Sequence, residues 1–251
     1  MVRDMPAGKS TALTHYTTFL AGRYAWTAGG EADQVRKNAE FFRDQGIIPG
    51  PGHTAIDLGA GCGFQSLPLA RAGFTVTAVD FCGTLLDELR QRAGSLPIVT
   101  ATSDIRNYSS WTGLHPSLIV CMGDTLTHLP SAEDVRDLIR QCASQLKPFG
   151  KLVLSYRDYS RELAGEVAVI PVRRGDAGIF LCRLAFHCDT VTVRDIMYSC
   201  RDGKWVRESG EYTKIRIDPE MLNDILAAAG FAIGYQSTDS GMVTIIAEKG
   251  R

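Results

Sequence analysis

The chain lacks a hydrophobic run long enough to span a bilayer, a block of basic residues and any pair of cysteines at CxxC spacing. A membrane-spanning helix needs about 20 consecutive apolar residues, and the apolar stretch at 117–122 is far shorter. Residues 1–10 also lack the charged-then-apolar pattern of a secretion signal. We therefore expect no membrane partner and a cytoplasmic location.

Charge and cysteine content exclude two further classes of protein. The formal net charge is −1, whereas a surface that binds nucleic acid usually shows clustered Lys and Arg. The seven cysteines are odd in number, which argues against a disulfide framework, and their spacing argues against a zinc site. We expect no nucleic-acid partner, no metal and reduced thiols, although Cys62 stands out because it lies in a glycine-rich loop.

The length of 251 residues suits one large α/β domain or one domain with a modest insert. Residues 11–43 have helical spacing that is broken at 27–30. A helix cannot continue through the run Pro49-Gly50-Pro51-Gly52. These features predict an N-terminal helical lid segment over 1–48 and a main domain over 49–251.

Strand-like and helix-like segments alternate after this boundary. The expected strands are 53–58, 74–79, 97–102, 117–122 and 150–156, and the expected helices are 64–72, 84–93 and 131–146. Such alternation implies right-handed crossovers and a mostly parallel, doubly wound α/β sheet. A helix beginning at Asp218-Pro219-Glu220 and two strands, 231–237 and 242–248, end the chain, the strands as an antiparallel hairpin.

A different pattern interrupts the alternation after Arg157. Apolar and polar residues alternate over 179–217, and Arg201-Asp202-Gly203-Lys204 has the composition of a hairpin turn. We therefore expect an antiparallel β insert at about 175–217.

The glycine-rich loop reads AIDLGAGCGF over 55–64. Glycines allow sharp turns and close approach to a ligand. The dinucleotide-binding fingerprint G-x-G-x-x-G needs a glycine where Phe64 stands. Asp57 before the loop would repel a pyrophosphate. A cationic ligand with an amino group fits this loop better.

Acidic residues end the next two expected strands. Asp80 lies about 20 residues beyond the loop, where its two oxygens can accept both hydroxyls of a ribose. Asp104 follows the third strand, where it can accept from an adenine amino group while Ile105 covers the ring face. The strand ends of a doubly wound sheet face one crevice, so these groups are expected to meet.

With this set of motifs the chain resembles the class I S-adenosylmethionine-dependent methyltransferases, whose first motif reads D-x-G-x-G-x-G. The turn LKPFG at 146–150 and the final hairpin add to the resemblance. It implies a Rossmann-like fold of seven strands, S-adenosylmethionine as cofactor, S-adenosylhomocysteine as product and a small-molecule acceptor. The cofactor-binding residues that we predict are Tyr16, Tyr24, Trp26, Asp57, Gly59, Ala60, Gly61, Asp80, Phe81, Asp104, Ile105, Met122 and Gly123.

The loop after the fourth strand is expected beside the methyl group. His128 has the chemistry of a base, since its unperturbed pKa lies near 6.5, and the alternative is that it packs against the next helix. Asp124 and Thr125 are comparable candidates for contact. The run GDTL at 123–126 lacks the N/D-P-P-Y/F motif of many nucleic-acid and protein-amide methyltransferases, which favours a small molecule.

The end of the fifth strand resembles the glycine N-methyltransferase branch of the family. By that resemblance Arg157 would hold the carboxylate of the acceptor, with Tyr159 beside it. The alternative is a surface salt bridge from Arg157 to Asp158 or Glu162. We count His128, Arg157 and Tyr159 as the catalytic candidates and expect the insert and the N-terminal segment to roof the acceptor pocket.

Two other functions compete with methyl transfer to a nitrogen or oxygen. A nicotinamide-dependent oxidoreductase is disfavoured by the loop spacing. A catalytically silent protein that senses S-adenosylmethionine would keep the loop, Asp80 and Asp104, and the sequence leaves this alternative open.

Overall fold

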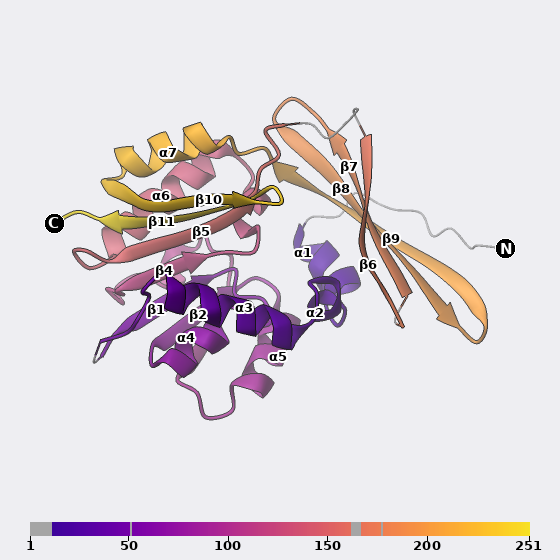
Figure 1. Cartoon of the computed structure of the whole chain (residues 1–251), viewed down its shortest axis with the longest axis horizontal. Coiled ribbons are helices and arrows are strands. Elements are labelled where there is room, and N and C mark those ends of the chain that lie inside the picture. The colour runs from indigo at the N-terminus through magenta and orange to yellow at the C-terminus, as the bar shows by residue number, and fades with distance from the viewer. Residues whose placement is uncertain (1–11, 51, 162–166, 177) are drawn as a thin grey trace.

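The main body of the protein is a seven-stranded sheet with strand order β10-β11-β5-β4-β1-β2-β3 (Figure 1). The structure is a computed structural model and describes residues 12–50, 52–161, 167–176 and 178–251. The strands are β1 (Thr54–Leu58), β2 (Thr75–Asp80), β3 (Ile98–Thr102), β4 (Leu118–Cys121), β5 (Lys151–Arg157), β10 (Phe231–Asp239) and β11 (Met242–Lys249). The pairs among β1 to β5 are parallel, and β11 runs antiparallel to both of its neighbours. The predicted α/β, doubly wound sheet with a final hairpin is confirmed.

Helices cover both faces of this sheet (Figure 1). One face carries α3 (Glu31–Asp44), α4 (Ser66–Ala72) and α5 (Gly83–Ala93), and the other carries α6 (Ala132–Gln145) and α7 (Pro219–Ala228). Strand residues alternate between the two cores: Ile56 packs with α6 and α7, whereas Ala55 packs with Phe42 of α3. No helix in the described residues is long and apolar enough to cross a membrane.

Capping residues set the starts of the last two helices where the sequence places them. Ser131 accepts a hydrogen bond from the backbone nitrogen of Asp134 at 3.1 Å, and Asp218 accepts from the backbone nitrogen of Glu220 at 2.8 Å. Such caps satisfy backbone donors that the first turn of a helix leaves free. Both helices therefore begin as the sequence predicts.

The N-terminal segment has two breaks rather than the one predicted at 27–30. Helix α1 (Ala12–His15) continues into the π-helical turn η1 (Tyr16–Leu20), and α2 (Tyr24–Thr27) follows after Ala21, which is extended, and Gly22. Helix α3 instead packs on the main sheet. The described residues of the predicted lid that lie beside the insert are 12–27 and Gly29, which is next to Arg173, and residues 1–11 fall outside the described part of the chain.

The insert is a separate four-stranded antiparallel sheet, β6-β7-β8-β9 (Figure 1). Its strands are β6 (Val167–Gly175), β7 (Gly178–Phe186), β8 (Thr190–Arg201) and β9 (Lys204–Ile215). The hairpin at 201–204 is confirmed, because Arg201 pairs with Lys204. The predicted start at about 175 is wrong, since β6 begins at Val167. Pro171 and the neighbouring bulge interrupt the alternation of β6, which an edge strand tolerates.

Candidate functional site

A cavity of about 480 Å³ lies over the carboxyl ends of the parallel strands. The predicted residues that line it are Tyr16, Tyr24, Gly59, Gly61, Asp80, Phe81, Asp104, Ile105, Gly123 and His128. Thr125, named above as a candidate for contact, also lines it, and the lining residues that we did not predict as site residues are Ala12, Leu13, Leu85, Thr102, Ser103, Arg106, Leu129 and Pro130. The loops after β1, β2, β3 and β4 thus meet at one crevice, with residues of α1, η1 and α2 closing it.

The floor of the cavity is the turn between β1 and α4, which Asp80 holds in place. The backbone nitrogens of Gly61 and Cys82 donate to the two carboxylate oxygens of Asp80 at 2.8 and 2.7 Å. Gly59 has φ +79°, and a Cβ there would lie 2.3 Å from Cγ2 of Thr125. The glycine loop and the loop after β4 therefore touch, and only a residue without a side chain fits at position 59.

Asp57 lies beneath the glycine loop and does not line the cavity. Its Oδ2 accepts a hydrogen bond from the Ser66 hydroxyl at 2.6 Å. Burial raises the pKa of the Asp57 carboxyl to about 7. Ala60 is also buried below the loop, where its nitrogen donates to the Val79 carbonyl oxygen at 3.1 Å. Asp57 and Ala60 therefore anchor the loop from below.

Two more predicted cofactor residues lie outside the lining. Trp26 packs under the guanidinium of Arg173, whose carbon lies 5.5 Å from the ring centroid. Met122 is buried, and its carbonyl oxygen accepts from the Thr125 hydroxyl at 3.0 Å. Trp26 thus contacts the insert, and Met122 shapes the loop that follows β4.

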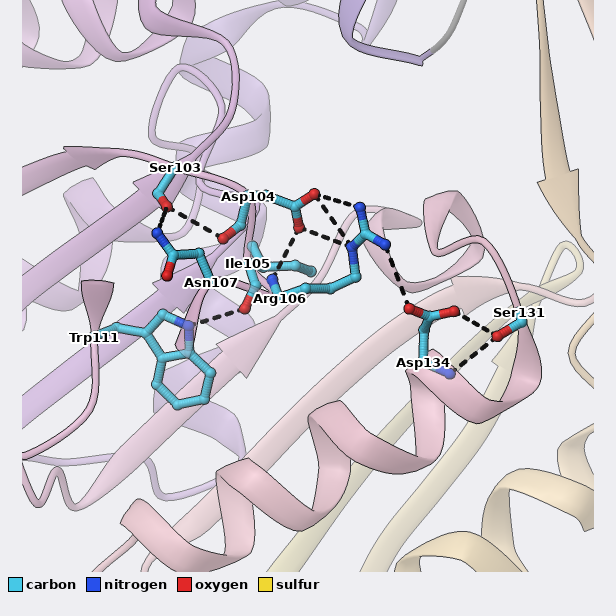
Figure 2. Close-up of polar contacts among 8 residues, drawn as sticks. All are labelled: Ser103, Asp104, Ile105, Arg106, Asn107, Trp111, Ser131 and Asp134. Atoms are coloured by element: carbon cyan, nitrogen blue, oxygen red, sulfur yellow. Dashed lines mark hydrogen bonds and ion pairs between the residues drawn. The ribbon is translucent and has the colours of Figure 1, made fainter. Parts of the chain in front are cut away.

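Figure 2 shows how the loop after β3 is held. The guanidinium and the backbone nitrogen of Arg106 donate to the Asp104 carboxylate, with Nη2 2.6 Å from Oδ2, and these hydrogen bonds lower the pKa of Asp104. Trp111 Nε1 donates to the Ile105 carbonyl oxygen at 2.9 Å, which fixes Ile105 with its side chain against the cavity. Ile105 therefore lines the cavity, whereas the Asp104 carboxylate is already bound by Arg106.

His128 and Tyr16 form a polar pair that also lines the cavity. His128 Nε2 lies 3.3 Å from the Tyr16 hydroxyl, and the imidazole stacks on Tyr212 with centroids 5.3 Å apart. Burial, and then the charge of Lys214, lower the pKa of His128 well below its ordinary value. Burial raises the pKa of the Tyr16 hydroxyl. The pair is therefore neutral at physiological pH and presents hydrogen-bonding atoms without charge.

Arg157 and Tyr159 meet around Asp124 and not in the cavity. The Arg157 backbone nitrogen donates to Asp124 Oδ1 at 2.8 Å, and the Tyr159 hydroxyl donates to Oδ2 at 3.3 Å. The guanidinium Nη1 of Arg157 donates to the Ser240 carbonyl oxygen at 3.0 Å. Asp158 accepts from the backbone nitrogen of Ser160 at 2.8 Å, and Glu162 lies outside the described residues.

A model of a methyltransferase domain matches residues 55–150, the span from β1 to the turn before β5. A methyltransferase from Streptomyces caelestis, CcbJ, has the same fold, with a TM-score of 0.79 at 20% identity over 95% of this chain and 99% of that one. Residues 55–150 of this chain thus match a methyltransferase domain, and the chain has the fold of S-adenosylmethionine-dependent methyltransferases.

Other relatives share the domain. A glycine/sarcosine N-methyltransferase from Parasynechococcus marenigrum is 27% identical over 165 residues, which is 62% of this chain and 52% of that protein. The chain spans about half the length of the curated relatives that it matches. CalS10, an amino pentose methyltransferase from Micromonospora echinaspora with bound S-adenosylmethionine, has a TM-score of 0.73 at 18% identity over 92% of this chain and 97% of that one.

The cavity of the methyltransferase domain fits S-adenosylmethionine, the cofactor of this family. Each Asp80 oxygen accepts one backbone N–H and keeps a lone pair for a ribose hydroxyl. Ile105 offers an apolar surface to the adenine ring, and Gly61 brings bare backbone to the cavity edge. The donors, acceptors and apolar surfaces of the floor therefore suit this cofactor.

The insert contributes no lining residue among those described, which corrects the expectation that it roofs the pocket. It supports the lid instead. His15 Nε2 lies 2.9 Å from Asp195 of β8, Arg23 Nη2 donates to Glu208 of β9 at 2.8 Å, and Tyr212 stacks on His128. The contact between His15 and Asp195 could not be predicted from the sequence, because 180 residues separate the two.

Proposed function

We propose that this methyltransferase domain transfers the methyl group of S-adenosylmethionine to a nitrogen of a small molecule. The observation that carries the proposal is the neutral Tyr16–His128 pair, which lines the same cavity as Gly59, Gly61 and Asp80. One wall suits the cofactor and the other offers uncharged hydrogen-bonding groups to an acceptor.

The protein has little covalent chemistry to perform. When bound, the cofactor supplies a methyl group already activated by its sulfonium. Asp80 binds the ribose and Ile105 covers the adenine, which fixes the donor end. A neutral amine attacks once its lone pair is in line with the methyl carbon. With the Tyr16 hydroxyl donating to Nε2 of neutral His128, the Tyr16 oxygen is free to accept a hydrogen bond from the amine nitrogen, and the ammonium formed by the transfer releases its proton to water.

Nitrogen is favoured over oxygen by the relatives and by the site. The names of the relatives include glycine, sarcosine and an amino pentose as substrates of those proteins. An alcohol acceptor needs a strong base to form its alkoxide, whereas an amine attacks in its neutral form. Because its pKa is lowered, His128 is a weak base, and this suits an amine.

The test is a panel of small amines with matched alcohols, using purified protein and labelled S-adenosylmethionine. The panel includes glycine, sarcosine and amino sugars, and product mass gives the number and position of methyl groups. We expect transfer to amines and not to the matched alcohols. Tight cofactor binding without transfer to any member of the panel would favour the sensor alternative.

The finer part of the proposal is an acceptor that bears a carboxylate, and it depends on Arg157. To hold the acceptor, the guanidinium has to turn away from Ser240. Arg157→Lys keeps the charge but loses the planar fork that binds a carboxylate through two hydrogen bonds. We expect kcat/KM for carboxylate-bearing amines to fall about tenfold while cofactor affinity stays the same. Equal turnover by the variant would remove the carboxylate from the proposal and leave methyl transfer in place.

A further inference from the structure

A buried ion pair joins the insert to the loop that follows β4. The Lys214 ammonium of β9 contacts Asp124 Oδ2, and both residues are buried. The Thr127 hydroxyl and the Arg157 backbone nitrogen donate to Asp124 Oδ1 at 2.9 and 2.8 Å. Together with the Tyr159 hydroxyl on Oδ2, these contacts give the carboxylate four donors from three parts of the chain.

This pair lies directly behind the cavity wall. Asp124 stands between Gly123 and Thr125, which both line the cavity, and it precedes the short helix η3 (Thr125–His128). Its backbone is left-handed, with φ +75°, so the carboxylate contacts hold a conformation that this residue adopts reluctantly. Fixing Asp124 therefore fixes the path of the loop to His128.

Stability alone does not explain a buried pair of charges. Removing both from water costs several kcal/mol each, and well-packed apolar residues of similar volume often stabilise a protein as much or more. A lysine in this place has a consequence that an apolar residue lacks, which is a positive charge fixed near the imidazole of His128.

Tyr212 brings the ammonium and the imidazole together. Lys214 Nζ lies 5.8 Å from the centroid of the Tyr212 ring, and the His128 imidazole stacks on the same ring. The other titratable groups that face His128 are Tyr16, which is hydrogen-bonded to it, and His15, which also packs on Tyr212; Asp124 pairs with Lys214. Burial lowers the pKa of His128 most, and the charge of Lys214 lowers it further.

We propose that Lys214 is a positioning residue for methyl transfer, which holds the loop 123–128 through Asp124 and keeps His128 neutral beside the acceptor. The proposal rests on the proposed function, because a neutral His128 matters only if an acceptor reaches it. The insert then influences the reaction indirectly, through the contacts of Lys214, although none of its described residues lines the cavity.

The test is a pH titration of the His128 imidazole by NMR on the full chain bound to S-adenosylhomocysteine. The His128 signal is identified by its loss in His128→Asn. We expect Lys214→Met to raise the midpoint of the titration, because a nearby like charge is removed. Arg194→Met is the matched control, since it removes a cation of β8 that pairs with Glu211 instead, and it is expected to leave the midpoint unchanged.

Lys214→Met leaves the Asp124 carboxylate buried without its ion-pair partner, and this can prevent folding. A second variant is designed for that outcome. Lys214→Met with Asp124→Asn removes both charges and keeps the shape, and the midpoint is expected to rise by a smaller amount. Unchanged midpoints in folded variants that still bind S-adenosylhomocysteine would overturn the role of Lys214. The titration needs no acceptor, so it tests the effect of Lys214 on His128 independently of methyl transfer. If the acceptor panel gives no product, the proposed function fails, but the effect of Lys214 on His128 is not contradicted.

Discussion

Asp80→Ala is expected to weaken the binding of S-adenosylmethionine ten- to a hundredfold. The change removes two acceptors for the ribose hydroxyls, worth roughly 1–3 kcal/mol. It also frees the backbone nitrogens of Gly61 and Cys82, which the carboxylate now holds. Isothermal calorimetry with the folded variant measures the change in Kd.

Asp104→Ala is the matched control for this experiment. Both carboxylates follow a strand of the parallel sheet and both line the cavity. Asp104 is half-exposed and bound by Arg106, so its loss is expected to change the Kd by about twofold or less. Unchanged binding in Asp80→Ala, or a larger loss in Asp104→Ala, would place the ribose elsewhere in the cavity.

Asp57→Asn is expected to stabilise the protein at pH 8 and to do so by less than half as much at pH 5, where only part of the ionisation penalty applies. Burial raises the folded pKa of Asp57 from 3.8 to about 7, so the folded state binds the proton more tightly than the unfolded state does. Between these values the free energy of unfolding falls as pH rises, and the full penalty, of the order of 4 kcal/mol, applies above pH 7. Asparagine removes the ionisation and keeps an acceptor for Ser66.

Thermal unfolding of both proteins over pH 5 to 8 measures this difference. Ser66→Ala is the companion variant, because it removes the hydrogen bond that lowers the pKa of Asp57, and its stability should go on falling to a higher pH than that of the wild type. Parallel pH profiles for the wild type and Asp57→Asn would show that Asp57 is ionised in the folded protein throughout this range.

Sequence reasoning predicted the cofactor half of the molecule because its signals are local. The glycine loop, the acid that ends β2 and the caps at Ser131 and Asp218 each depend on residues close together in the chain. They appear in the structure on the expected elements. The alternation of strands and helices likewise predicted the mostly parallel, doubly wound sheet.

The acceptor half was predicted less well because its contacts join distant segments. Lys214 reaches Asp124 across 90 residues, and no spacing rule links such a pair. Strand β6 was missed because Pro171 hides its alternation, and the orientation of the Arg157 side chain depends on the turn at Ser240. Residue type at a strand end indicates which crevice a side chain can reach, but packing decides whether it does so.

The contacts between the lid and the insert also bear on how acceptor choice can change in evolution or by engineering. His15 fits against Gly210 of β9 so closely that a Cβ there would lie 2.3 Å from Nδ1 of the imidazole. Residues 12–27 and β6–β9 are thus a matched pair, distant in sequence yet shaped to each other. A chimera that exchanges both segments with a homologue keeps this fit and leaves the cofactor half intact. One that exchanges a single segment brings a new surface against His15 or Gly210, so the fit between the two segments is inherited only when both are exchanged together.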